Sequence, residues 1–263
     1  MVITKSYEVI QEIEEISLNA WPSLQQILYD GWILRFANGY TKRANSVNPV
    51  YTSHKNVYEK IERCKQIYID KNLSPVFRIT PLAHPEHLDE ILANAGFEKK
   101  DVSSVQVMDL ISLQAEVTGD IRFWSEFSHD WLDSFVHLDG VTLSKESLTA
   151  ILRNIASKKC FAVLLKDNQV VSCGLGVLEN QYIGLFEVIT AKTERRKGFG
   201  KELILNILNW AKQNGAQKAY LQVVMNNKPA LNLYSKLGFQ EVYQYFRTYA
   251  LTGKTNYGGM VFR

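Results

Sequence analysis

A basic, glycine-containing segment carries the clearest chemical signal in this sequence. Residues 195–201 combine four basic side chains with two glycines at alternate positions, in the order Arg195, Arg196, Lys197, Gly198, Phe199, Gly200, Lys201. Glycine lets backbone N–H groups approach a ligand closely, and a helix N-terminus adds about half a positive charge. The segment therefore predicts an anion site that suits a pyrophosphate.

Two commoner phosphate motifs are excluded by single residues. A dinucleotide-binding fingerprint needs a third glycine where Leu203 stands, and a P-loop needs Ser or Thr where Glu202 stands. The remaining alternative is a solvated basic turn with one glycine kept for packing. The segment on its own does not decide between this alternative and a phosphate site.

A second motif lies downstream and gives the first its context. It consists of Asn227, Ala230, Leu233, Tyr234, Gly238 and Phe239. Together the two motifs resemble the GCN5-related N-acetyltransferase (GNAT) family, which carries Arg/Gln-x-x-Gly-x-Gly/Ala at a strand-to-helix junction and then Asn-x-x-Ala-x-x-Leu-Tyr-x-x-x-Gly-Phe. The resemblance covers residues 159–249, and residues 31–47 resemble the start of a two-domain bacterial subgroup.

The resemblance implies acetyl-CoA as co-substrate and assigns roles to residues of this chain. Residues 195–201 would hold the pyrophosphate, and the backbone of Val188, Ile189 and Thr190 would lie along the pantetheine arm. Asn227 would contact the cofactor, act as a helix N-cap, or do both. Tyr234 would protonate the departing thiolate, and the alternative is an aromatic residue that only fills the core.

Attack by an amine also needs a base, and Glu187 is the best-placed carboxylate by sequence. It precedes the cofactor-pairing residues and shares a strand face with Ile189. A water chain as the base, or a solvent-facing Glu187, stays open. His129 and His137 are interpreted as surface or packing residues, with a place beside the acceptor as the alternative.

Hydrophobic periodicity predicts the elements that position these residues. In the C-terminal half it indicates strands at 161–166, 170–178 and 182–190, a helix at 199–213, a strand at 219–224, a helix at 229–237 and a last strand at 242–249. Earlier, residues 31–50 alternate around Asn38-Gly39, which predicts two antiparallel strands joined by a tight turn. Helices at 56–70 and 86–95 are expected on either side of a strand at 75–80.

An internal repeat predicts two related domains. ILANAGFE at 91–98 is similar to LYSKLGFQ at 233–240, and chance similarity is the alternative. Leu92 stands where Tyr234 does, and residues 48–55 hold no glycine. We therefore expect an α/β (α+β) fold with two GNAT-like domains, each a mixed, mostly antiparallel sheet flanked by helices. Residues 1–112 would lack a cofactor site, and residues 118–263 would be catalytic.

The composition of the chain limits the classes of partner that can be expected. The chain has 30 basic and 27 acidic residues, and a net charge of +3 does not indicate a nucleic-acid or membrane surface. No stretch approaches the ~18 apolar residues of a membrane span, and the first twenty residues lack a signal-peptide core, so we expect a cytoplasmic protein.

Cys64, Cys160 and Cys173 are expected to be reduced and buried, with a covalent role as the alternative. The HPEH segment at 84–87 does not place two ligands on one helix face, so no metal is expected.

The expected function is acetyl-CoA-dependent transfer of an acetyl group to a primary amine of a small molecule or peptide, by direct attack in a ternary complex. The alternative is a non-catalytic acyl-CoA sensor or interaction protein on the same fold. The sequence leaves the acceptor, a homodimer and the further role of the first domain open. Arg35, Lys42 and Arg43 could face an acidic acceptor, but their alternation favours a solvated strand face.

Overall fold

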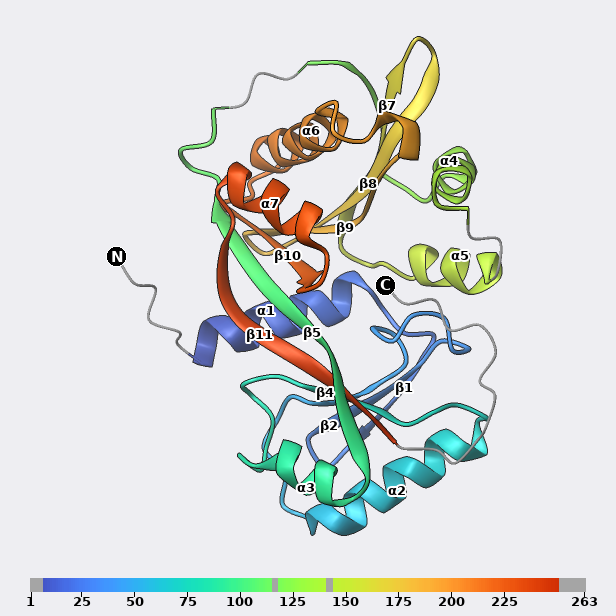
Figure 1. The fold of residues 1–263 in the computed structure, drawn as a ribbon, viewed down its shortest axis with the longest axis vertical. Coiled ribbons are helices and arrows are strands. Elements are labelled where there is room, and N and C mark those ends of the chain that lie inside the picture. Colours follow the sequence, from blue (N-terminus) through green and yellow to red (C-terminus); the bar gives the residue numbers. More distant parts are fainter. Residues whose placement is uncertain (1–6, 115–117, 141–143, 251–263) are drawn as a thin grey trace.

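The computed structural model describes residues 7–114, 118–140 and 144–250, which form one eleven-stranded sheet with helices on both faces (Figure 1). The helices are α1 (Tyr7–Ala20), α2 (Val57–Asp70), α3 (Leu88–Asn94), α4 (His129–Asp139), α5 (Lys145–Arg153), α6 (Phe199–Gln213) and α7 (Lys228–Leu237), with a 3₁₀ turn, η1 (Lys192–Glu194), before α6. The strands are β1 (Gln25–Tyr29), β2 (Trp32–Phe36), β3 (Val47–Pro49), β4 (Val76–Ile79), β5 (Phe97–Asp109), β6 (Asp120–Trp124), β7 (Lys158–Lys166), β8 (Gln169–Glu179), β9 (Tyr182–Thr190), β10 (Lys218–Val224) and β11 (Gln240–Ala250).

The sheet has the order β1-β2-β3-β4-β11-β5-β10-β9-β8-β7-β6. Its pairs are antiparallel except β3 with β4 and β9 with β10. In the C-terminal half, α6 and α7 cover one face and α4 and α5 the other (Figure 1). The expected fold class is therefore confirmed, and so is the order β-β-β-α-β-α-β from β7 to β11.

The two halves of the chain exchange their long strands. β11 lies between β4 and β5, and β5 lies between β11 and β10. Figure 1 shows β5 and β11 running diagonally from the half that carries α6 and α7 to the half that carries α2 and α3. A single sheet thus joins segments that the sequence pattern had assigned to separate domains. Residues 115–117 of the expected linker lie outside the described residues, as do residues 251–263 of the expected catalytic domain.

The internal repeat has a structural counterpart. Helices α3 and α7 are each followed by a glycine in the left-handed region, Gly96 with φ +82° and Gly238 with φ +99°, and each glycine leads directly into one of the exchanged strands. A left-handed residue after the last helical turn is the usual end of a helix, and glycine adopts it without strain. Units β4–α3–β5 and β10–α7–β11 therefore share one local design.

The expected tight turn at Asn38-Gly39 is wrong. The tight turn of this region lies at Asp30-Gly31 between β1 and β2, whereas β2 and β3 are joined by a longer loop, residues 37–46. The side chain of Asn45 organises this loop. Its Oδ1 accepts from the backbone N of Ala37 at 2.7 Å and of Gly39 at 3.0 Å, and its Nδ2 donates to two further carbonyls of the loop. A buried amide that forms four hydrogen bonds replaces the two-residue turn.

Helix α1 is fixed to β4 and β11 by a buried ion pair and a hydrogen bond. Arg78 of β4 donates to Glu14 of α1 through both terminal nitrogens, with Nη2 2.9 Å from Oε1, and the Tyr243 hydroxyl of β11 donates to the same carboxylate. Glu14 is fully buried, and Arg78 is 2% exposed. One carboxylate therefore links α1 to strands from both halves of the chain. Within the described ranges, no helix combines the length and apolarity that crossing a bilayer requires.

Glu14→Gln should destabilise the fold strongly. The substitution keeps the shape but leaves the Arg78 charge buried without its counterion, and breaking a buried pair in this way costs about 3–5 kcal/mol. The free energy of unfolding in urea measures the change. Glu8→Gln is the control, since Glu8 is exposed in the first turn of the same helix, and a change there should stay below about 1 kcal/mol. Equal effects of the two substitutions on the free energy of unfolding would contradict a stabilising role for the buried pair of Glu14 and Arg78.

Candidate active site

The site begins where two parallel strands separate. β9 and β10 are paired only from Tyr182↔Lys218 to Leu185↔Leu221, although β9 continues to Thr190 and β10 to Val224. Beyond this point β10 stays paired with β5, and β9 stays paired with β8. Beyond Leu185, the edge of β9 that faces away from β8 thus has backbone groups without a strand partner in the described sheet, and this edge includes residues 188–190.

A β-bulge marks the point of separation. Glu187 and Val188 of β9 together oppose the single residue Gly174 of β8, and Glu187 has φ +48°. A bulge of this kind redirects a side chain, and a non-glycine residue with positive φ is an uncommon, strained conformation. Val188 packs against the cluster beneath α6, whereas Ile189 packs against the cluster on the opposite face.

A cavity of about 310 Å³ lies between the separated strand ends. It is lined by Thr41, Arg43, Ser103, Leu185, Phe186, Glu187, Val188, Gln222, Val223, Val224, Asn227, Ala230, Tyr234, Tyr245 and Arg247. The structure thus places four of the predicted site residues around one space, namely Glu187, Val188, Asn227 and Tyr234. Ile189, Thr190 and the basic segment 195–201 are not among its lining residues.

Glu187 is a half-buried carboxylate in this cavity. Its removal from water raises its pKa, and the positive charge of Arg43 partly opposes the rise. A carboxyl group with a raised pKa is a stronger base once it has lost its proton. Its position and its pKa both suit a group that accepts a proton from a substrate.

Tyr234 contributes a phenol from α7. Its ring contacts Phe239 edge-on, with the ring centroids 5.8 Å apart, and burial raises the pKa of the hydroxyl to about 12. The phenol therefore keeps its proton at neutral pH. Within the part of the chain that the structure describes, its hydroxyl forms no hydrogen bond, so the proton is available to a ligand. Asn227 caps the same helix, and its Oδ1 accepts from the N–H of Ala230 at 3.3 Å.

The basic segment forms the strand-to-helix junction before α6. Gly198 is the N-cap residue with φ +98°, and the first helical bond runs from the N–H of Glu202 to its carbonyl at 3.0 Å. The first-turn N–H groups that precede this bond have no partner in the helix. A Cβ on Gly200 would lie 3.1 Å from Oγ1 of Thr190, so a glycine brings the helix start close to the end of β9.

The charges of this segment are distributed unevenly. Arg195 Nε donates to the carbonyl of Thr190 at 3.3 Å, and Lys197 Nζ lies 3.1 Å from the Glu194 carboxylate. Arg196, with φ +65°, and Lys201 are exposed. Phe199 packs against the core cluster beneath α6. The segment therefore presents free N–H groups and exposed cations to solvent, as an anion site requires.

Residues from the first half of the chain also reach the cavity, and here a sequence expectation is wrong. Arg35 and Lys42 were expected on a solvated face, yet they are only 1% and 5% exposed. Arg35 Nη1 donates to the carbonyl of Arg43 at 2.9 Å, and its Nη2 donates to that of Leu18 at 3.0 Å. Arg35 thus holds the loop 37–46 that brings Thr41 and Arg43 to the cavity.

Other candidate residues lie elsewhere. His129 and His137 are exposed on α4 and do not line the cavity. Cys64, Cys160 and Cys173 are buried, which confirms their packing role, and burial raises the pKa of each thiol. No group of three or more potential metal ligands comes together among the residues that were described.

Tyr245 and Arg247 line the cavity but were missed. They lie on β11, where the residues at positions 243, 245 and 247 are all buried. The alternation of large polar side chains on the last strand was the signal that could have drawn attention to them, because a charged residue in such a row is expected to face a partner or a ligand.

Comparison with known proteins decides the family. Residues 8–248 match a family model described as "Probable histone acetyltransferase Rv0428c C-terminal". The chain belongs to this family. It is an N-acetyltransferase of the GNAT family, as the two sequence motifs indicated.

Relatives of this GNAT protein cover almost its whole length. It is 29% identical over 238 residues to the Bacillus subtilis (strain 168) protein named "Uncharacterized N-acetyltransferase YobR", covering 89% of this chain and 95% of the relative. A GCN5-related N-acetyltransferase from Kribbella flavida superposes with a TM-score of 0.71 at 13% identity, over 96% and 97% of the two chains. A tandem GNAT protein from the clavulanic acid biosynthesis pathway gives 0.64 at 12% identity, over 93% and 89%. At these identities the two structures show a shared fold across both halves of the GNAT chain.

Proposed function

We propose that the protein transfers an acetyl group from acetyl-CoA to a primary amine of a small molecule or peptide, by direct attack in a ternary complex. The observation that carries the proposal is the meeting of Glu187, Asn227 and Tyr234 in one cavity between separated strands. A base, an acid and a strand edge with free backbone groups are then in reach of one reacting centre.

The cofactor would span two neighbouring features. Its pyrophosphate would bind the N–H groups before α6, and its pantetheine arm would pair with the backbone of residues 188–190. Support comes from the close approach of Gly200 to Thr190, which places the helix start beside the end of the unpaired strand edge. The thioester would then enter the cavity at Glu187 and Val188.

The chemistry needs three proton transfers. Glu187 accepts a proton from the incoming ammonium and passes it to solvent, so that the neutral amine can attack the thioester carbon and form the new C–N bond. When the C–S bond breaks, Tyr234 donates its proton to the departing sulfur, and the surplus proton that the nitrogen then releases returns Tyr234 to its phenol form. A phenol near pKa ~10 in water is a poor acid toward a thiolate near ~8.5, so this transfer depends on direct contact in the complex. No feature of the described residues favours the non-catalytic alternative.

We also infer that the first half of the chain has no second cofactor site. Leu92 occupies the place of Tyr234 in the repeat and is fully buried in the core beneath α3. We propose that residues 118–263 carry out the catalysis and that residues 1–112 bind no cofactor. This division concerns function only, because the strands of the two units interleave in one sheet.

Tyr234→Phe should lower turnover about 100-fold or more, because the proton donor is lost while the ring is kept. Release of free coenzyme A thiol, measured against a panel of amines, gives the rate. The affinity for coenzyme A and the melting temperature should stay unchanged, since the hydroxyl has no partner among the described residues. Unchanged turnover would remove Tyr234 from this role. Cofactor binding without turnover of any amine would contradict the proposed activity itself.

The rate should depend on pH through Glu187. The base is active when deprotonated, so kcat/KM should rise as pH increases through its pKa. Because burial raises that pKa, the rise should lie above the ordinary range of glutamate. Glu187→Gln should abolish this limb of the profile and lower kcat about 100- to 10,000-fold. A Gln variant with the same pH profile as the wild type would show that another group is the base.

Gly198→Val should weaken coenzyme A binding at least about tenfold, because a branched side chain does not tolerate φ +98° and the N–H groups would turn away. Calorimetric titration should give one cofactor per wild-type chain. Gly215→Val is a matched control, since Gly215 has φ +94°, has similarly open surroundings and follows the other end of α6. Its affinity should match the wild type. Two cofactors per chain would contradict the single-site proposal.

A further inference from the structure

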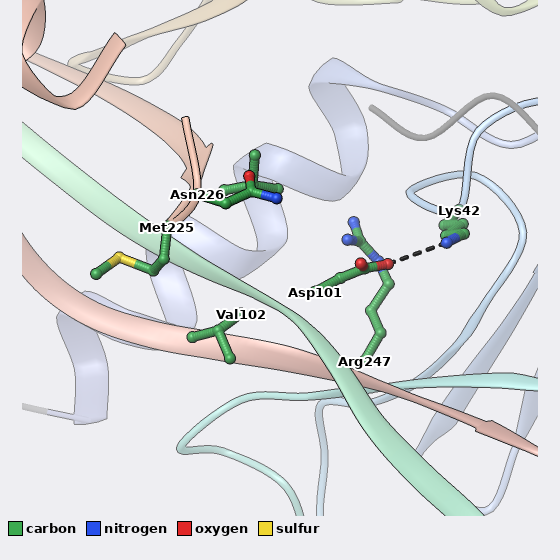
Figure 2. Close-up of a pocket in the computed structure, with 7 residues that line it drawn as sticks. Lys42, Asp101, Val102, Met225, Asn226 and Arg247 are labelled. Carbon is green, nitrogen blue, oxygen red and sulfur yellow. Dashed lines mark hydrogen bonds and ion pairs between the residues drawn. The ribbon is translucent and has the colours of Figure 1, made fainter. Parts of the chain in front are cut away.

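A second cavity adjoins the first on the side of the exchanged strands. It measures about 350 Å³ and is lined by Lys42, Asp101, Val102, Val224, Met225, Asn226 and Arg247 (Figure 2). Val224 and Arg247 line both cavities. The combined space therefore leads from Glu187 and Tyr234, where the chemistry is proposed, to a wall built by the loop 37–46, β5 and β11.

Three basic and two acidic side chains line this combined space. Lys42 Nζ lies 3.0 Å from Oδ2 of Asp101, and the hydroxyl of Tyr249 donates to the same carboxylate. The charge of Arg43 acts on Glu187, whose pKa it lowers against the effect of burial. Each carboxylate thus has a basic neighbour of its own, and Arg247 is the surplus cation of the space.

Arg247 is buried but incompletely bonded. It is 2% exposed, and its Nε is buried without a hydrogen-bond partner within the described ranges. Its Nη2 donates to the Tyr245 hydroxyl over a long 3.4 Å, and Figure 2 shows the guanidinium beside Asp101, with no ion pair drawn between them. A buried guanidinium with unmet donors is costly unless an anion completes its hydrogen bonds.

The field around Arg247 is positive as well. Burial raises the pKa of Tyr245, yet the charges of Arg247, Arg78 and Arg43, together with a hydrogen bond to Ser103, outweigh burial and lower the pKa to about 8. Arg78 lies 3.8 Å from the centroid of the Tyr245 ring. This part of the cavity therefore attracts a negative group, and it repels the cationic side chains of a basic peptide.

We propose that Arg247 binds a carboxylate of the acceptor, and that the acceptor class is a small amine that carries a carboxylate, such as an amino acid. This deepens the proposed acetyl transfer and rests on it. The planar guanidinium matches a carboxylate in shape and can donate two parallel hydrogen bonds. One surplus cation balances a carboxylate, whereas a phosphate monoester carries about −1.5 to −2 charges at neutral pH. The basic segment 195–201 does not line either cavity, so the two anion sites are separate.

The test compares matched acceptors. Release of coenzyme A thiol is measured with a set of free amino acids and with the corresponding amino-acid amides, which differ only in the carboxylate. Wild-type kcat/KM should favour the acids about 10- to 100-fold, the range expected for hydrogen bonds between charged groups. Arg247→Met should raise KM for the acids to the level of the amides and leave kcat nearly unchanged, because the carboxylate is held equally in the ground and transition states.

Arg247→Lys is the second variant. It keeps the positive charge but cannot donate two parallel hydrogen bonds, so it should retain part of the preference for acids over amides. N-acetyl-L-alanine, which has a carboxylate and no free amine, supplies a readout without turnover. Its affinity should fall at least about tenfold in Arg247→Met, while coenzyme A affinity stays unchanged.

Turnover of amides and acids at equal kcat/KM would overturn this inference and leave the acetyltransferase activity standing. Absence of turnover with every acceptor would instead contradict the activity, and equal binding of N-acetyl-L-alanine by wild type and variant would exclude Arg247 as the carboxylate site.

Discussion

The exchange of β5 and β11 is the constraint on which the rest of the structure depends. Because β11 lies between β4 and β5, neither half of the chain can complete its part of the sheet without a strand from the other. The buried pair of Glu14 and Arg78, with Tyr243, ties α1 to β4 and to the exchanged strand β11. Ser103 and Asp101 of β5, and Tyr245 and Arg247 of β11, are thereby brought to the cavities. A site that could have been local to one domain is instead shared between the halves.

The separation of β9 from β10 supplies the second requirement. A strand that is paired on both sides has no free backbone groups, so a ligand that pairs with β9 needs β10 to diverge. The bulge at Glu187 coincides with this divergence and places a non-glycine residue at φ +48°. Strain of this kind persists only where the surrounding packing enforces it. Pairing of β8 with β9 resumes beyond the bulge at Cys173↔Ile189, which keeps the unpaired edge in a fixed position.

The sequence predicted local features well and long-range ones poorly, for physical reasons. Periodicity identified α6 at its observed bounds because α6 buries one regular face, and it identified β7 and β8 because they are continuous apolar runs bounded by polar turns. The strand β5 went unrecognised, since its charged start, FEKKD, hides a strand whose partners lie in the other half of the sheet. The turn at Asn38-Gly39 was wrong because the side chain of Asn45 stabilises a longer loop, and side-chain satisfaction of a loop has no short sequence signature.

The long-range packing that a sequence pattern does not show also explains why the positions of the charged residues were predicted wrongly. Alternation along a strand assigned Arg35 and Lys42 to solvent, but alternation gives only the face of a sheet, and it does not say what covers that face. Here α1 and the loop 37–46 cover Arg35, and Lys42 lies in that loop and packs over the Tyr249 ring, so both cations are buried and must be balanced individually. Arg35 is satisfied by backbone carbonyls and Lys42 by Asp101, whereas the Nε atoms of Arg43 and Arg247 have no hydrogen-bond partner among the described residues, and only Arg43 has Glu187 as the counterion that its charge acts on. A fold can bury a paired cation for structural reasons alone. A buried cation that lines a cavity and keeps an unmet donor is instead explained most simply by a ligand that completes its hydrogen bonds.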